Sequence, residues 1–502
     1  MAAAVRRRGG FGVLLVLALA VVVAACSGGG SEDVADRPPD LESVGTEAWM
    51  GEGVDPGATA VQPGPSSEDP TAAGEVEVPT GPASAPPPAG GDAAPVDPST
   101  DVAAIVASMT VEQKVGQLFT ATVIGDDAVS VSDAAATANQ ALYGVATPAE
   151  VVERYHLGGV AYFAHDQGPG TSNVADPVRT AALSAGLQQA AAAGSGIGLL
   201  IGADQEGGPV VRLRSPVTVF PSARDVARTG DVDLAREVGQ VTGTEMRAVG
   251  VNWVYAPVAD VNVNPSNPVI GERAFGTSAD AVVPFVRATA EGLAAGGVLP
   301  TLKHFPGHGD TDIDSHSSLP TITHDAATLE SVDWPPFALA EELAPISVMV
   351  GHLAVPSLDP SGRPATISAD ILSVLRDDAG AGGQGDGGLG FDGLVVTDAM
   401  NMGALTGFGD AGSLAVDAIV AGVDVVLMPS DLPVAWEAVR AAVESGEISA
   451  ARLDEAVTRI LEAKAAIGVL DARAAGGGID PSVLGTPAHA DVRARVEAAC
   501  GC

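Results

Sequence analysis

The segment from Lys303 to His316 is dense in side chains that can exchange protons or hold charge. It contains three histidines, three aspartates and one of the chain's three lysines. It follows the apolar run 297–302, so these groups begin where a buried strand opens into a loop. Asp314 stands two residues before His316, and histidine exchanges protons near neutral pH. The pair could therefore work as a general acid and base.

The same segment does not match a metal site. Asp310, Asp312 and Asp314 alternate as in a calcium loop. That loop needs glycine at its sixth position and glutamate at its twelfth, where this chain has Ser315 and Thr321. The histidines lack the spacing of a zinc site on one helix, because prolines and glycines between them prevent a helix. We expect no metal ion, and no motif predicts a cofactor.

Other polar groups also follow short apolar runs. Asp398 comes directly after the run 393–397, and Asp204 directly after the run 199–203. The carboxyl ends of parallel strands form the face where α/β barrel enzymes keep their catalytic groups. A lone aspartate at a strand end is more often a helix cap than a nucleophile. Beside a histidine-rich loop, however, Asp398 becomes a candidate nucleophile.

These groups require an α/β framework to position them. Alanine-rich segments predict helices over Asp233–Ala248, Ala279–Ala295 and Ala451–Ile467. They alternate with seven apolar runs that predict strands, at 158–164, 198–203, 252–258, 298–303, 346–352, 393–397 and 423–428. We therefore predict a single catalytic domain over residues 101–475, a (β/α)8 barrel of the TIM type, with a short tail at 476–502. The sequence does not place the eighth strand.

Five ordered motifs resemble glycoside hydrolase family 3, in its β-N-acetylglucosaminidase (β-hexosaminidase) branch. They are DQEGG (204–208), NPVIGERAFG (267–276), KHFPGHGD (303–310), DSH (314–316) and VTDAMNM (396–402). Supporting matches are MTVEQKVGQLF (109–119) and PATIS (364–368). The resemblance covers roughly residues 101 to 470, and five motifs in order are far more specific than any one of them alone.

The resemblance implies a role for each matching residue. Asp398 would be the nucleophile, and His316, oriented by Asp314, would replace the carboxylic acid that protonates the leaving group in β-glucosidase branches. The sugar would be bound by five further residues: Asp204, Arg212, Arg273, Lys303 and His304. The family usually has arginine where this chain has Pro209, so one local contact is expected to differ.

The N-terminus predicts a lipoprotein. Arg6–Arg8 precede the apolar run Phe11–Ala25, and the residues before Cys26 match a bacterial lipoprotein cleavage box. We expect residues 1–25 to be a signal peptide and Cys26 to carry a lipid that anchors the protein at the extracytoplasmic face of the cell membrane. The alternative is an uncleaved membrane anchor, but the apolar run is shorter than a typical span.

Residues 26–100 predict a disordered linker rich in proline, glycine and acidic residues. Between Ser27 and Asp101 there are thirteen prolines and fifteen acidic residues, against Arg37 as the one basic residue. Such a composition cannot bury a core. The segment would be a flexible tether between membrane and enzyme.

The charge of the whole chain limits its partners. A net charge of −38 argues against nucleic acid as a partner, because both would be negatively charged. Cys500 and Cys502 end the chain and could bridge each other or another protein. We expect a monomer whose partner is an amino-sugar oligosaccharide or muropeptide derived from peptidoglycan.

The resemblance implies an exo-acting hydrolase that removes β-linked N-acetylglucosamine from wall fragments. Phosphorolysis stays open, because a histidine-based site lacks the second carboxylate that would repel phosphate. A family 3 β-glucosidase and a catalytically inactive wall-binding lipoprotein are the remaining alternatives. The filled catalytic positions count against inactivity.

The predicted lipid anchor has a direct test. Cys26→Ser should release the protein from the membrane fraction or leave it unprocessed, because the thiol of Cys26 is the atom that would take the lipid. Membrane fractionation and the mass of the mature protein measure this. Unchanged membrane association together with an unchanged mature mass would rule out lipidation at this position.

Overall fold

The described part of the chain begins after the predicted linker. The computed structural model describes residues 101–163, 170–377, 388–476 and 479–502. The predicted signal peptide, the linker and Cys26 lie outside these ranges. Within them, no helix combines the length and apolar character needed to cross a bilayer.

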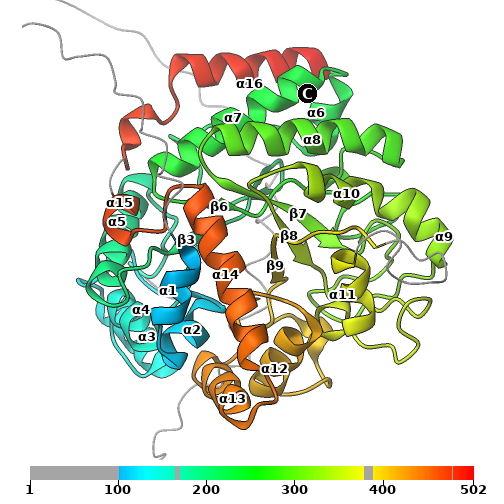
Figure 1. The fold of residues 1–502 in the computed structure, drawn as a ribbon. Coiled ribbons are helices and arrows are strands. Elements are labelled where there is room, and N and C mark those ends of the chain that lie inside the picture. The colour runs from blue at the N-terminus through cyan, green and yellow to red at the C-terminus, as the bar shows by residue number, and fades with distance from the viewer. Residues whose placement is uncertain (1–100, 164–169, 378–387, 477–478) are drawn as a thin grey trace, which may run out of the picture. The chain divides into compact units, whose positions relative to one another are not determined.

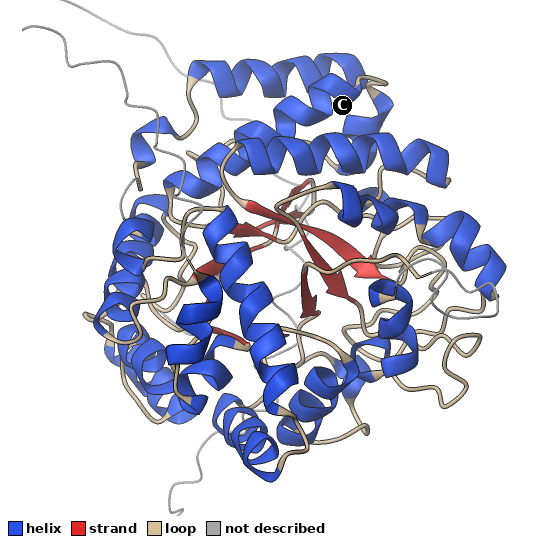
Figure 2. Ribbon diagram, in the orientation of Figure 1, coloured by secondary structure: helices blue, strands red, loops and turns tan. Residues whose placement is uncertain are grey.

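Eight parallel strands form a closed sheet, in the order β10-β1-β2-β3-β6-β7-β8-β9. A bridge between Val396 and Val425 joins β9 to β10, and Thr397 N–H donates to Val425 O at 3.0 Å. Helices pack around this sheet (Figures 1 and 2), which confirms the predicted (β/α)8 barrel. The strands are β1 Phe119–Thr122, β2 Gly159–Ala161, β3 Leu200–Ala203, β6 Trp253–Val254, β7 Leu299–Phe305, β8 Ser347–Val350, β9 Leu394–Thr397 and β10 Val426–Leu427.

The strand that the sequence did not place is β1. A single residue, Leu118, separates it from helix α2 (Val111–Gln117), and no glycine or proline marks the boundary between the two elements. The predicted helices are confirmed as α7, α8 and α14, within one residue of the expected bounds. The longer helices are α1 Val102–Ser108, α3 Asp133–Tyr143, α4 Pro148–Tyr155, α5 Pro177–Ala193, α6 Ala223–Arg228, α7 Val232–Ala248, α8 Ala279–Ala295, α10 Pro335–Glu342, α11 Ala369–Arg376, α12 Ala411–Ala421, α13 Leu432–Ser445, α14 Ala450–Ala466 and α16 Pro487–Cys500.

Glycines bring α7 and α8 into backbone contact. A Cβ atom added at Gly243 would lie 2.6 Å from the carbonyl oxygen of Leu293, and one at Gly292 would lie 2.1 Å from that of Arg236. Any side chain at these positions would push the helices apart. Because α8 leads into β7, this contact fixes the strand that carries Lys303 and His304.

Trp253 lies in a network of buried polar side chains inside the barrel. Its indole Nε1 lies 2.9 Å from Thr301 Oγ1 and 3.0 Å from Ser347 Oγ, and its ring meets Tyr255 edge-on at 5.1 Å between centroids. The buried indole N–H is therefore satisfied within the core. These contacts join β6, β7 and β8 beneath the cavity described below.

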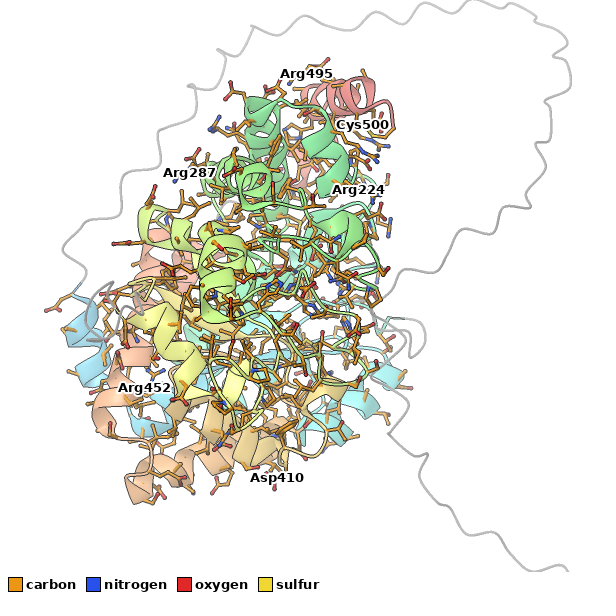
Figure 3. All side chains as sticks on the ribbon, turned by 90° about the vertical axis from the view of Figure 1, so that its right-hand side faces the viewer. Arg224, Arg287, Asp410, Arg452, Arg495 and Cys500 are labelled. Atoms are coloured by element: carbon orange, nitrogen blue, oxygen red, sulfur yellow. A yellow bond between two sulfur atoms is a disulfide. The ribbon has the colours of Figure 1, made fainter. Side chains whose placement is uncertain are left out.

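The predicted tail folds against the barrel. Helix α16 packs on α6 and α7 (Figure 1), and Figure 3 shows Arg495 and Cys500 on it. The buried carboxylate of Glu245 lies 2.7 Å from His489 Nδ1 and accepts from Gly485 N–H at 2.8 Å. Cys500 and Cys502 form a disulfide with each other, one of the two pairings that the sequence left open.

Asp424 holds the seam where the barrel closes. Its carboxylate is fully buried and accepts from Val395 N–H of β9 at 3.0 Å. Three guanidinium groups reach it from the surrounding helices: Arg376 at 2.5 Å, Arg452 at 3.1 Å and Arg459 at 3.4 Å. The start of β10 is thus tied to β9 by charge as well as by backbone hydrogen bonds.

Asp424→Ala should lower the free energy of unfolding by about 3–5 kcal/mol, because it leaves poorly solvated arginines without their partner. Urea titration of the folded protein measures this. The matched control is Asp417→Ala, whose ion pair with Arg363 is about 40% exposed at both side chains and should be worth about 1 kcal/mol or less. Equal small losses in the two variants would contradict the structural role of Asp424.

Candidate active site

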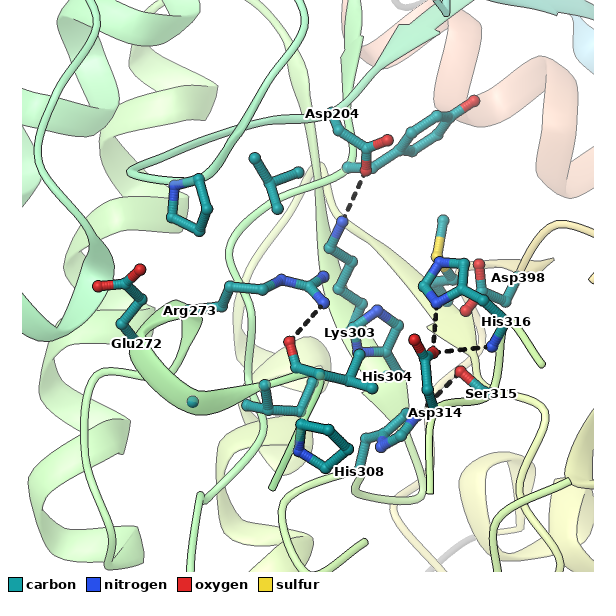
Figure 4. Close-up of a pocket in the computed structure, with 18 of the residues that line it drawn as sticks. Asp204, Glu272, Arg273, Lys303, His304, His308, Asp314, Ser315, His316 and Asp398 are labelled. Carbon is teal, nitrogen blue, oxygen red and sulfur yellow. Dashed lines mark hydrogen bonds and ion pairs between the residues drawn. The ribbon is translucent and has the colours of Figure 1, made fainter. Parts of the chain in front are cut away.

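One cavity of about 550 Å³ lies at the carboxyl ends of the strands and gathers every predicted catalytic and sugar-binding residue. The residues come from the ends of β3, β7 and β9 and from the loop after β7 (Figure 4). Two more come from the segment that follows the hairpin of β4 (Gln205–Gly207) and β5 (Val210–Val211), and from the short helix η2 (Gly271–Arg273) after β6. The full set is Asp204, Arg212, Arg273, Lys303, His304, Asp314, His316 and Asp398.

Asp398 is the candidate nucleophile and follows β9 directly. It is 9% exposed, and Ala399 N–H donates to its Oδ1 at 2.8 Å. Burial opposes ionisation, but the positive charge of nearby histidines, His304 foremost, outweighs it and holds the pKa of this carboxyl below its usual value. The group is therefore an ionised carboxylate at the cavity wall, the form that attacks an electrophilic carbon.

Asp314 and His316 form a hydrogen-bonded pair beside Asp398 (Figure 4). The imidazole Nδ1 lies 2.6 Å from Asp314 Oδ1, and the backbone N–H of His316 donates to the same oxygen at 2.9 Å. Partial burial opposes ionisation of Asp314, but these two hydrogen bonds lower the pKa of the carboxyl below its usual value. The carboxylate fixes the orientation of the ring, as proton transfer by a histidine requires.

Buried groups hold the loop that carries this pair. His308 Nδ1 lies 2.7 Å from Thr311 Oγ1, and its Nε2 lies 3.1 Å from Ser315 Oγ. Burial lowers the pKa of His308 to about 4, so near neutral pH the ring is uncharged and holds the loop by hydrogen bonds. The carbonyl of His316 accepts from Gly403 N–H at 3.0 Å, which ties the loop to the segment that follows the nucleophile.

Lys303 is buried and bridges two carboxylates. Its Nζ lies 2.8 Å from Asp204 Oδ1 and 2.6 Å from Glu206 Oε1. Arg212 lies 3.0 Å from Asp204, and Arg273 makes two contacts of 2.9 Å with Glu206. Burial opposes each charge, but mutual attraction keeps the pKa of both carboxyls below, and that of Lys303 above, their usual values. These carboxylates and cationic side chains beside the cavity therefore stay charged.

An irregularity in β7 turns two adjacent residues toward the cavity. The strand pairs with β8 up to Lys303, skips His304 and resumes at Phe305. In a regular strand, successive side chains point to opposite faces. Here both Lys303 and His304 line the cavity, because the register shifts between them.

Two carboxylates of the site had no role assigned from the sequence. Glu206 was noted as part of a motif, and it pairs with Arg273 from 67 residues away. Asp260 is fully buried, and its Oδ2 lies 2.8 Å from His304 Nδ1, 44 residues away. A position at a strand end was the one signal available for Asp260, because the sequence alone does not pair residues so far apart.

This arrangement combines three kinds of chemistry around one cavity. It offers an ionised carboxylate at Asp398, an imidazole oriented by its own carboxylate, and a cluster of charged donors and acceptors. Such a cluster suits a ligand rich in hydroxyl groups, since each group can donate or accept. The geometry therefore fits displacement at a carbon atom with acid–base assistance.

Comparison with curated proteins gives several long matches. The chain is similar to beta-hexosaminidase A of Pseudoalteromonas piscicida, with 33% identity over 69% of this chain. It spans 59% of the length of that relative. It is also similar to beta-hexosaminidase LpqI of Mycobacterium tuberculosis, with 34% identity over 62% of this chain and 77% of the relative.

Comparison with solved structures agrees. A glycoside hydrolase family 3 beta-N-acetylglucosaminidase from Paenibacillus superposes with a TM-score of 0.67 and 37% identity, over 78% of this chain and 69% of that one. LpqI of M. tuberculosis superposes with a TM-score of 0.60 and 33% identity, over 72% of this chain and 96% of that one. The glycosyl hydrolase family 3 N-terminal domain matches residues 110–463. The chain therefore belongs to glycosyl hydrolase family 3.

Proposed function

We propose that this protein is an exo-acting, retaining β-N-acetylglucosaminidase. It removes terminal β-linked N-acetylglucosamine from peptidoglycan fragments, and a lipid on Cys26 anchors it at the extracytoplasmic face of the cell membrane. The observation that carries the proposal is the single cavity shared by Asp398, the Asp314–His316 pair and the charged cluster around Lys303.

In the first step, Asp398 attacks the anomeric carbon while the bond from that carbon to the glycosidic oxygen breaks. The imidazolium of His316 gives its Nε2 proton to the departing oxygen, which leaves as an alcohol. The result is a glycosyl-enzyme ester and a neutral imidazole.

In the second step, water attacks the same carbon, and His316 takes the proton of that water. The ester bond breaks, and Asp398 returns as a carboxylate. Two displacements restore the β configuration. Asp314 holds the ring and stabilises its charged form in both steps.

The charged cluster accounts for recognition of the sugar. Asp204, Arg212, Arg273, Lys303 and His304 bind the hydroxyl groups of the terminal residue. Their ion pairs, with one another and with Glu206 and Asp260, orient these side chains before the sugar arrives, which limits the entropy lost on binding. The two curated relatives described above, both named beta-hexosaminidase, support an N-acetylated amino sugar in this position. The cleavage box at Cys26 supports a wall-derived substrate, because it would place the enzyme outside the membrane.

Phosphorolysis is the competing reaction, and product analysis separates the two. We expect the disaccharide of N-acetylglucosamine and N-acetylmuramic acid to give free N-acetylglucosamine at the same rate with and without phosphate. Time-resolved mass spectrometry follows both products. Accumulation of a sugar phosphate, with turnover that rises with phosphate concentration, would show that the reaction is phosphorolysis. The assignment of Asp398 as nucleophile would then be unchanged.

His316→Ala should depress hydrolysis of this disaccharide by about 10²–10⁴-fold, because its poor leaving group needs the proton. A dinitrophenyl N-acetylglucosaminide, whose leaving group needs little protonation, should lose far less. Asp314→Ala should follow the same pattern more mildly. Steady-state kinetics on both substrates measure this, and equal losses would mean that another residue supplies the proton.

A further inference from the structure

His324 lies between two carboxylates outside the catalytic cavity. Its Nδ1 lies 2.7 Å from Asp333 Oδ2, and its Nε2 lies 3.1 Å from Asp310 Oδ2. Asp333 is fully buried, whereas the side chains of Asp310 and His324 are 29% and 17% exposed. None of the three lines the cavity. The proposed reaction therefore does not use them directly.

The three residues connect the catalytic loop to the body of the protein. Asp310 stands on that loop, four positions before Asp314. Asp333 ends the short helix η3 (Leu329–Asp333), which lies outside the loop. A Cβ atom added at Gly307, at the root of the loop, would lie 2.8 Å from the Cβ of Asp333. The loop therefore contacts the buried Asp333 at two places: directly at Gly307, where the loop begins, and through His324 at Asp310.

Both ring nitrogens of His324 face a carboxylate oxygen. A neutral imidazole has one N–H, so it cannot donate to two carboxylates unless the group gains a proton. Burial raises the pKa of Asp333 to about 6, against the hydrogen bond and charge of His324. With Asp333 protonated, its hydroxyl group can donate to His324 Nδ1 while the ring donates from Nε2 to Asp310.

Between Asp310 and the catalytic pair, two asparagines hold Thr311: Asn264 Nδ2 donates to its carbonyl oxygen at 2.9 Å, and Asn267 Nδ2 donates to its Oγ1 at 3.2 Å. Asp312 and Ile313, between Asp310 and the catalytic pair, are exposed. Thr311 points inward to His308. The contact of Asp310 with His324 therefore adds a charged point of attachment to the loop before it reaches Asp314.

We propose that Asp310, His324 and Asp333 position the Asp314–His316 pair for proton transfer. They are positioning residues, and the proposal rests on the proposed role of His316 as acid and base. When the contact is lost, the loop shifts, and His316 meets the glycosidic oxygen less often in a productive geometry. A displacement of about 1 Å in such a group can cost about 10²-fold in rate. The sugar-binding cluster stands on other elements and keeps its geometry.

Asp310→Asn tests the proposal, because it keeps the shape of the side chain and removes the charge that faces His324. Asp312→Asn is the matched control: it makes the same charge change on the same loop at an exposed position. For each variant, kcat and KM are measured on the disaccharide and on the dinitrophenyl glycoside. The ratio of the two kcat/KM values does not depend on the fraction of folded enzyme, so partial misfolding does not blur the result.

We expect Asp310→Asn to lower kcat on the disaccharide at least about tenfold and on the dinitrophenyl glycoside less than about threefold, with KM little changed. Asp312→Asn should leave the ratio at its wild-type value. An unchanged ratio in Asp310→Asn, or the same change in both variants, overturns the positioning role. His316→Ala is measured in parallel. If this variant also leaves the ratio unchanged, the acid–base assignment of His316 fails. If the ratio changes in His316→Ala but not in Asp310→Asn, only the positioning role of Asp310 is refuted.

Discussion

The buried ammonium group of Lys303 is the interaction on which the site depends. An isolated charge in a protein interior is too costly to keep, so Lys303 needs its two carboxylate partners. Asp204 comes from the end of β3 and Glu206 from the following hairpin, so neutralising one lysine on β7 draws three segments together. Arg212 and Arg273 complete the cluster. The same contacts that satisfy the charge also arrange donors and acceptors around a cavity before any sugar is present.

The two proposed catalytic groups are held in different ways. Asp398 stands at the end of a barrel strand and takes its position from the sheet. His316 stands on a loop, and its position depends on the neutral ring of His308 within the loop and, beyond it, on the backbone of Gly403 and on His324. Gly403 follows the nucleophile by five residues, so its hydrogen bond links the two catalytic groups to each other. This division suits a reaction in which the nucleophile stays fixed and the acid–base group must meet leaving groups of different shape.

The barrel and the residues of the cavity could be predicted because strand ends and ordered motifs are local features. Strand β1 was not predicted, because a single residue separates it from helix α2 and no turn residue marks the boundary. Glu206 and Asp260 gained roles from partners far away in sequence, which only the closed barrel brings within reach. His324 and Asp333 gave no signal at all. Their importance comes from a contact with the catalytic loop, and spacing along the chain does not encode that contact.

The anomeric configuration of the first product tests most directly whether Asp398 and His316 act in two successive displacements. Proton NMR of the N-acetylglucosamine released from an aryl β-N-acetylglucosaminide, recorded within the first minutes before mutarotation, reports that configuration. We predict that the β anomer appears first and the α anomer grows in later. Initial release of the α anomer would mean a single displacement by water and would contradict the role of Asp398 as nucleophile.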